Sequence, residues 1–211
     1  MKRFLFFILL ILILVIVNCV PSSYQSPKVL RPGEKALGAG VFFGKYESVI
    51  PVDLSLYFRH GVFEKADLGL KVSGFPDLGH NVFFDAKYNF LEQPLLISGD
   101  FGFMTFAEYF TPDDELKALG FHPTVLFGSN RIYGGIGWNY FILREKKSPM
   151  FKEPYVSISR ESGPRLLIGT SLGRKWKFNS ELIFSSYSKD RFPGSVVVVG
   201  FGIHRVFIRK N

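Results

Sequence analysis

The chain alternates apolar and polar residues with a period of two along most of its length. The first clear example sets an apolar group, Val52, Leu54, Leu56 and Phe58, against an intervening group of Asp53, Ser55, Tyr57 and Arg59. A period of two places the two groups on opposite faces of a β-strand, and helical spacing does not fit them. The pattern therefore predicts strands with one apolar and one polar face.

Ten segments show this alternation. They lie near residues 34 to 44, 50 to 59, 64 to 74, 80 to 90, 94 to 106, 118 to 128, 131 to 143, 164 to 173, 176 to 186 and 195 to 207. The 24 Phe, 9 Tyr and 21 Gly agree with this reading, because aromatic residues favour strands and glycine punctuates them. The sequence therefore predicts an all-β protein.

The first residues indicate export from the cytoplasm. A basic start, Met1-Lys2-Arg3, precedes the apolar run Phe4–Val17, which is shorter than the roughly 20 residues of a membrane-spanning helix. The segment Ile16-Val17-Asn18-Cys19 resembles a bacterial lipobox. This resemblance implies that residues 1–18 form a removable signal helix and that Cys19 then carries lipid, including an amide-linked acyl chain such as palmitate. The alternative is an uncleaved membrane anchor.

The rest of the chain divides into three parts. Residues 19–33 contain three prolines and no periodic pattern, which predicts a flexible lipidated tether. Residues 34–208 form the strand-rich domain, and residues 209–211 form a short tail. The formal charge of +8 falls to +6 without Lys2 and Arg3, and the basic residues are dispersed, so we expect no nucleic-acid partner. The single cysteine excludes an internal disulfide framework.

Two all-β architectures fit the alternation. In a membrane barrel the apolar face meets lipid, whereas in a periplasmic lipid-anchored β-sandwich or lipocalin-like cup it forms the core and binds a hydrophobic ligand. The export signal, the aromatic residues at strand ends and the glycine-rich second face favour the barrel. We therefore predict an antiparallel up-and-down transmembrane β-barrel of about ten strands, within a range of eight to twelve.

Strand parity and connection lengths complete the predicted topology. A bacterial single-chain barrel has an even number of strands, so we assign the weak run Tyr155 to Ser159 to an outer loop. The long polar connections Ala107 to Lys117 and Arg144 to Gly163 are expected to face outward. The short connections, expected at the periplasmic end, lie around Gly61, Glu92, Asn130 and Lys175.

Residues 34 to 207 resemble small bacterial outer-membrane β-barrels, and more closely a group of lipoprotein-tagged barrels of unassigned function. The last strand is similar to the assembly signal of such proteins, with Phe207 preceded at alternate positions by Ile203, Phe201 and Val199. The resemblance implies an outer-membrane location, anchoring through Cys19 and a monomeric state. It also implies that membrane lipid and the lipoprotein-processing and barrel-assembly machineries are the partners.

Ionisable residues of both signs fall on the face predicted to line the lumen. The predicted network comprises Asp53, Arg59, Asp67, Lys71, Asp85, Lys87, Asp100 and Glu181, with Lys177 on the same face. Charges buried in a narrow lumen must be paired, because an unpaired one costs several kcal/mol. A salt-bridged plug is therefore predicted, and a small-solute pore or an acid/base pair for a lipid-modifying reaction are the alternatives.

Other motifs do not indicate catalysis. The four histidines, His60, His80, His122 and His204, lack metal-ligand spacing, so neither a metal nor a cofactor is expected. Gly169-Thr170-Ser171-Leu172-Gly173 matches G-x-S-x-G, but strand-like residues follow where a nucleophile elbow needs a helix. Gly38-Ala39-Gly40 and Gly200-Phe201-Gly202 lack the third glycine of a dinucleotide loop. The sequence predicts a non-enzymatic outer-membrane lipoprotein with a structural, surface-contact or minor channel role.

Overall fold

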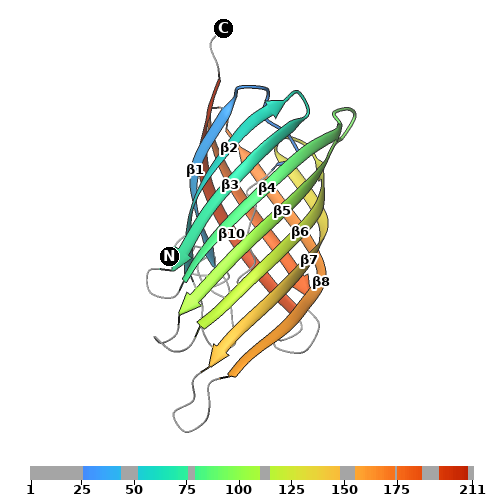
Figure 1. The fold of residues 1–211 in the computed structure, drawn as a ribbon. Helices are drawn as coiled ribbons and strands as arrows, with labels where there is room; N and C mark the ends of the chain where they lie inside the picture. Colours follow the sequence, from blue (N-terminus) through green and yellow to red (C-terminus); the bar gives the residue numbers. More distant parts are fainter. Residues whose placement is uncertain are drawn as a thin grey trace, which may run out of the picture.

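The computed structural model describes residues 26–43, 52–75, 79–109, 115–147, 155–173, 175–186 and 195–208, and these ranges form a closed antiparallel β-barrel (Figure 1). Each strand pairs with its neighbours in the sequence, and the first strand pairs with the last. The ten strands are β1 (Lys35–Phe43), β2 (Val52–Phe63), β3 (Ala66–Phe75), β4 (Gly79–Leu91), β5 (Leu96–Tyr109), β6 (Glu115–Gly128), β7 (Ile132–Lys147), β8 (Tyr155–Leu172), β9 (Trp176–Ser186) and β10 (Ser195–Phe207).

The predicted fold class and strand count are confirmed, but one boundary was wrong. The run Tyr155 to Ser159, assigned to a loop, is the start of β8 and pairs with Leu143–Lys147 of β7. As a separate strand this run would make the strand number odd, but in the barrel it is continuous with residues 160–172, so the number stays ten. In the barrel Gly163 is buried and Pro164 is exposed on the outer face, so the strand continues through both.

The connections differ in length at the two ends of the barrel. Four hairpins join β2 to β3, β4 to β5, β6 to β7 and β8 to β9 over two to four residues, close to the predicted short connections. These hairpins and the end of β10 lie at the same end (Figure 1), which we call the short-turn end. The opposite, long-loop end has shorter connections than predicted, because β5 reaches Tyr109 and β7 reaches Lys147.

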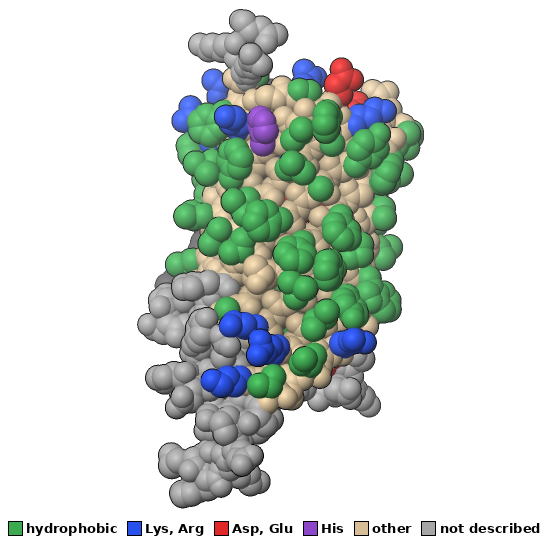
Figure 2. All heavy atoms as spheres, in the orientation of Figure 1, with side chains coloured by type: hydrophobic (Ala, Val, Ile, Leu, Met, Phe, Trp, Pro, Cys, Tyr) green, Lys and Arg blue, Asp and Glu red, His purple; other side chains and the backbone are tan. Residues whose placement is uncertain are grey.

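The apolar face of every strand lies on the outside of the barrel. Figure 2 shows hydrophobic side chains over the middle of the visible face and basic side chains near both ends. Outward residues with large exposed fractions include Leu56 (66%), Ile136 (58%), Phe178 (58%) and Phe84 (50%). This arrangement contradicts the sandwich and lipocalin alternatives, in which the same residues would form a buried core.

The inside of the barrel is filled by side chains of two kinds. Buried polar and charged residues alternate with the exposed apolar residues along the strands. A buried apolar cluster also lies inside and consists of Phe42, Leu126, Tyr133, Leu167, Ile183 and Val198. In the part of the chain that the structure describes, no helix is long and apolar enough to cross a membrane.

Candidate functional site in the lumen

The structure places all eight residues of the predicted charge network inside the barrel. Each is at most 9% exposed, although a charged side chain is rarely so buried without compensation. They come from β2 (Asp53, Arg59), β3 (Asp67, Lys71), β4 (Asp85, Lys87), β5 (Asp100) and β9 (Glu181). The structure divides them into two groups, one toward the short-turn end and one around Lys71.

The first group is centred on Arg59. Its guanidinium donates one hydrogen bond to Asp67 Oδ1 and another to Asp85 Oδ1. Gly69 makes this possible, because it pairs with Arg59 on one side and Asp85 on the other. A Cβ at Gly69 would lie 2.5 Å from Asp85 Oδ2 and 2.6 Å from Arg59 Nη2. The missing side chain therefore gives the ion pair its space.

Lys87 connects this group to the N-terminal segment, which we define as Ser26–Gly33. Its Nζ lies 3.7 Å from Asp67 Oδ2 and donates hydrogen bonds to the carbonyl oxygens of Ser26 (2.9 Å) and Lys28 (2.8 Å). The Lys87 side chain is only 2% exposed, so these main-chain carbonyls replace the water that its ammonium has lost. The N-terminal segment thus completes the solvation of a buried charge.

Further contacts hold the N-terminal segment inside the barrel. Pro27 and Val29 are buried, and Ser98 Oγ donates a hydrogen bond to the Pro27 carbonyl. The Leu30 N–H donates to Asp67 Oδ2 at 2.8 Å. The described part of the predicted tether, residues 26–33, therefore contacts the barrel interior. Sequence periodicity could not reveal this, because most of these contacts use main-chain groups of the segment.

The second group surrounds Lys71 on β3. Its ammonium lies 4.5 Å from the centroid of the Phe42 ring and 5.4 Å from that of Phe83, within the range of cation–π attraction. Asp53 and Glu181 supply the negative charge that acts on it. Glu181 also accepts a hydrogen bond from the Tyr133 hydroxyl at 2.7 Å.

Several buried polar residues in the lumen were absent from the predicted network. Arg165 alternates with the apolar, exposed residues Leu166 and Ile168 on β8, so the alternation could have identified it as inward. Glu161 was missed because its segment was assigned to a loop. Two further hydrogen-bonded groups lie in the lumen: one consists of Tyr57, Asn179 and His204, and the other of His122, Asn139 and Ser185.

The histidines and the G-x-S-x-G match take separate places in the described part of the barrel. Among the described residues, no three His, Cys, Asp or Glu side chains converge as metal ligands. His60 lies at the barrel rim, and the side chain of His80 lies outside the described set. Ser171 of the G-x-S-x-G match is buried on the inward face of β8, and its Oγ has no hydrogen-bond partner among the described residues. The buried side chains of the network fill part of the barrel interior.

Cys19, residues 1–18 and the tail 209–211 lie outside the described residues. The predicted cleavage and lipidation therefore stay predictions.

Comparison with known proteins gives a likeness of fold alone. No protein-family model matches the sequence, and no curated protein matches it either. Among solved structures, the N-terminal β-barrel domain of Pseudomonas aeruginosa OprF is 10% identical, covers 84% of this chain and 100% of its own, and gives a TM-score of 0.40. Neisserial surface protein A is 9% identical, covers 82% and 96%, and scores 0.37. OprG of Pseudomonas aeruginosa is 12% identical, covers 88% and 100%, and scores 0.35. Likeness at this level says nothing about what this chain binds or does.

Proposed function

We propose that this chain is a monomeric outer-membrane β-barrel lipoprotein, additionally anchored through Cys19, with a structural or surface-contact role and no enzymatic activity. The observation that carries the proposal is that the apolar side chains of the barrel wall point outward, the reverse of their arrangement in a soluble protein. Its outer surface is apolar and exposed, and its interior is filled by buried polar and charged residues and a buried apolar cluster. A soluble protein would leave a large apolar surface in water, whereas a bilayer solvates it.

The outer surface of β7 shows the extent of the apolar belt. Its outward positions from Ile132 to Ile142 are apolar, aromatic or glycine, and the next two are Arg144 and Lys146. A tilted strand of this length spans about 25 Å, the height of the apolar band of outer-membrane barrels. The charge therefore begins where the hydrocarbon is expected to end.

The filled lumen favours a closed barrel rather than an open channel. The Arg59 ion pairs, the N-terminal segment and the buried apolar cluster occupy the interior together. Removing the N-terminal segment alone would leave the apolar cluster in place. A small-solute channel is the second candidate function. It would require both the N-terminal segment and the apolar cluster to move out of the lumen.

The sequence signature around Cys19 supports the lipid anchor, and the polar connections at the long-loop end support a role in surface contact. Export through the lipoprotein-processing machinery and insertion by the barrel-assembly machinery follow from the same proposal. A Cys19→Ala variant should lose incorporation of labelled palmitate. Retained labelling would contradict the anchor without affecting the barrel.

Gel mobility in mild SDS tests the barrel itself. A folded membrane barrel resists SDS until it is boiled, so the unboiled protein should migrate faster than the boiled protein. Planar bilayers then test the closed lumen, where we expect no steady conductance from the wild type. Identical mobility would contradict the membrane barrel, and a stable conductance that changes in Asp85→Asn would favour the channel.

A further inference from the structure

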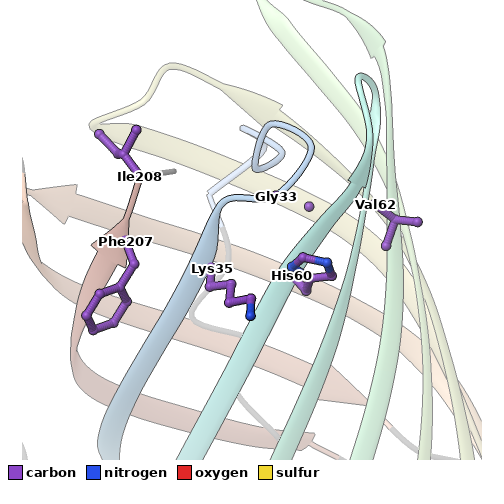
Figure 3. A pocket seen from close by; sticks show the side chains of 7 residues that line it. Gly33, Lys35, His60, Val62, Phe207 and Ile208 are labelled. Carbon is purple, nitrogen blue, oxygen red and sulfur yellow. The ribbon is translucent and has the colours of Figure 1, made fainter. Parts of the chain in front are cut away.

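A notch interrupts the outer rim of the barrel at the short-turn end (Figure 3). It arises because β1 begins only at Lys35, whereas β2 continues past it to Phe63 and β10 ends beside it at Phe207. The chain reaches β1 from inside the barrel by crossing the rim at Gly33, whose φ of 80° suits glycine. The result is an open cavity of about 580 Å³ between two strand ends.

The notch has basic, aromatic and aliphatic walls. Its described lining residues are Gly33, Lys35, His60, Gly61, Val62, Phe207 and Ile208, and none of these is acidic. Lys35 and His60 pair across β1 and β2, and their side chains lie next to each other in Figure 3. His60 Nδ1 contacts the Glu34 carbonyl oxygen at 3.3 Å, and the ring stacks on Phe58. These contacts orient the imidazole.

The acidic residue between Gly33 and Lys35, Glu34, is not among the residues that line the notch. The Glu34 carboxylate accepts a hydrogen bond from the Arg31 N–H at 2.9 Å. A second cation, Arg205, stands beside the notch with its guanidinium 5.1 Å from the centroid of the Phe207 ring and 5.7 Å from that of Trp176. Lys35 and Phe207 therefore line the cavity, and Arg205 lies next to it, against the Phe207 ring.

Lys35 and Arg205 mark the edge because their outward neighbours toward the barrel middle are apolar. Leu37 follows Lys35 on β1, and Ile203 precedes Arg205 on β10, and both are exposed on the outer face. A molecule in the notch would meet cations at the rim and apolar side chains along the wall. Anionic lipids have this distribution, with a phosphate above acyl chains.

We propose that the notch binds the phosphate-bearing headgroup of an anionic phospholipid in the leaflet at the short-turn end. Lys35 and Arg205 contact the phosphate, His60 supplies a further polar contact, and the acyl chains lie along Leu37 and Ile203. This site rests on the proposed membrane barrel, since a soluble chain would offer no leaflet at this edge.

Native mass spectrometry of the full chain in a neutral detergent tests the site. Phosphatidylglycerol should bind more tightly than phosphatidylcholine of the same acyl chains. The variant K35Q/R205Q should lose about fivefold in phosphatidylglycerol affinity for each cation removed. The matched control R144Q/K146Q removes the same charge at the long-loop end and should bind phosphatidylglycerol as the wild type does.

Two outcomes would overturn the site. Equal losses in K35Q/R205Q and R144Q/K146Q would show that net charge alone attracts the lipid. Displacement of phosphatidylglycerol by millimolar inorganic phosphate, with phosphate itself retained on the protein, would assign the notch to the free anion. The unboiled gel band separates this failure from failure of the proposed function, because the fast band should persist in both variants if the barrel stands.

Discussion

The outward and inward faces of β3 (Ala66–Phe75) carry different kinds of side chain along the same strand. The outward side chains Leu68 and Val72 are about half exposed, at 52% and 47%, whereas the inward Asp67 and Lys71 are 0% and 4% exposed. A shift of one residue would exchange the two sets. The comparison teaches that the face on which a residue lies decides whether a charged side chain is tolerated in the barrel wall. On the inner face, a charged side chain needs a partner.

Removing the central inner cation should have the largest effect. Arg59→Met leaves Asp67 and Asp85 without their shared partner, and breaking a buried ion pair from one side costs about 3–5 kcal/mol. Urea unfolding of the protein in lipid vesicles measures this loss. Lys146→Met, at the exposed rim, serves as the control and should change the free energy of unfolding by less than about 0.5 kcal/mol. Equal losses of stability in the two variants would contradict the claim that a charge on the inner face depends on its partners.

A charge placed on the outer face should have the next largest effect. Leu56→Arg introduces a cation near the middle of β2, where an arginine facing the bilayer midplane costs about 2–4 kcal/mol. Phe63→Arg, at the short-turn end of the same strand, should lose only about 0–1 kcal/mol. The same vesicle unfolding assay compares the two. A larger loss at Phe63 would contradict the assigned belt.

A methyl group added at Gly69 should disturb the inner ion pair. Because the new Cβ would approach both Arg59 and Asp85, we expect Gly69→Ala to lose about 1–3 kcal/mol of stability. The outer face offers a matched control in Gly134→Ala, whose Cβ would lie no closer than 3.1 Å to the Phe127 ring. A smaller loss at Gly69 than at Gly134 would argue against the ion pair as drawn.

The smallest predicted effect concerns a single hydrogen bond. Ser98→Ala removes the donor to the Pro27 carbonyl and should cost about 1 kcal/mol, with faster hydrogen exchange at the Leu30 amide. Thr170→Ala is the control, because Thr170 shares a hydrogen bond with Ser180 away from the N-terminal segment. Unchanged exchange at Leu30 in Ser98→Ala would mean that Asp67 alone holds that amide.

Alternation sufficed to predict the strands, whereas the choice of a barrel with the eight network residues inside also needed the export signal, the aromatic strand ends and the glycine-rich second face. The register between strands was not predictable, so neither were the partners of Arg59. The N-terminal segment escaped prediction because its carbonyl groups, which accept bonds from Lys87 and Ser98, carry no sequence signal. The start of β8 escaped because the parity argument counted Tyr155 to Ser159 as a separate strand, whereas this run is continuous with the rest of β8.

The two tryptophans test the central claim, that the apolar outer face meets lipid, most directly. Trp138 faces outward near the middle of the belt on β7, and Trp176 faces outward at the start of β9, each about half exposed. Single-tryptophan variants, W176F and W138F, should both be quenched by brominated lipids in vesicles. Trp138 should respond most to bromine deep in the acyl chains, and Trp176 to bromine near the headgroups. Full fluorescence of both tryptophans in brominated vesicles would contradict the membrane barrel.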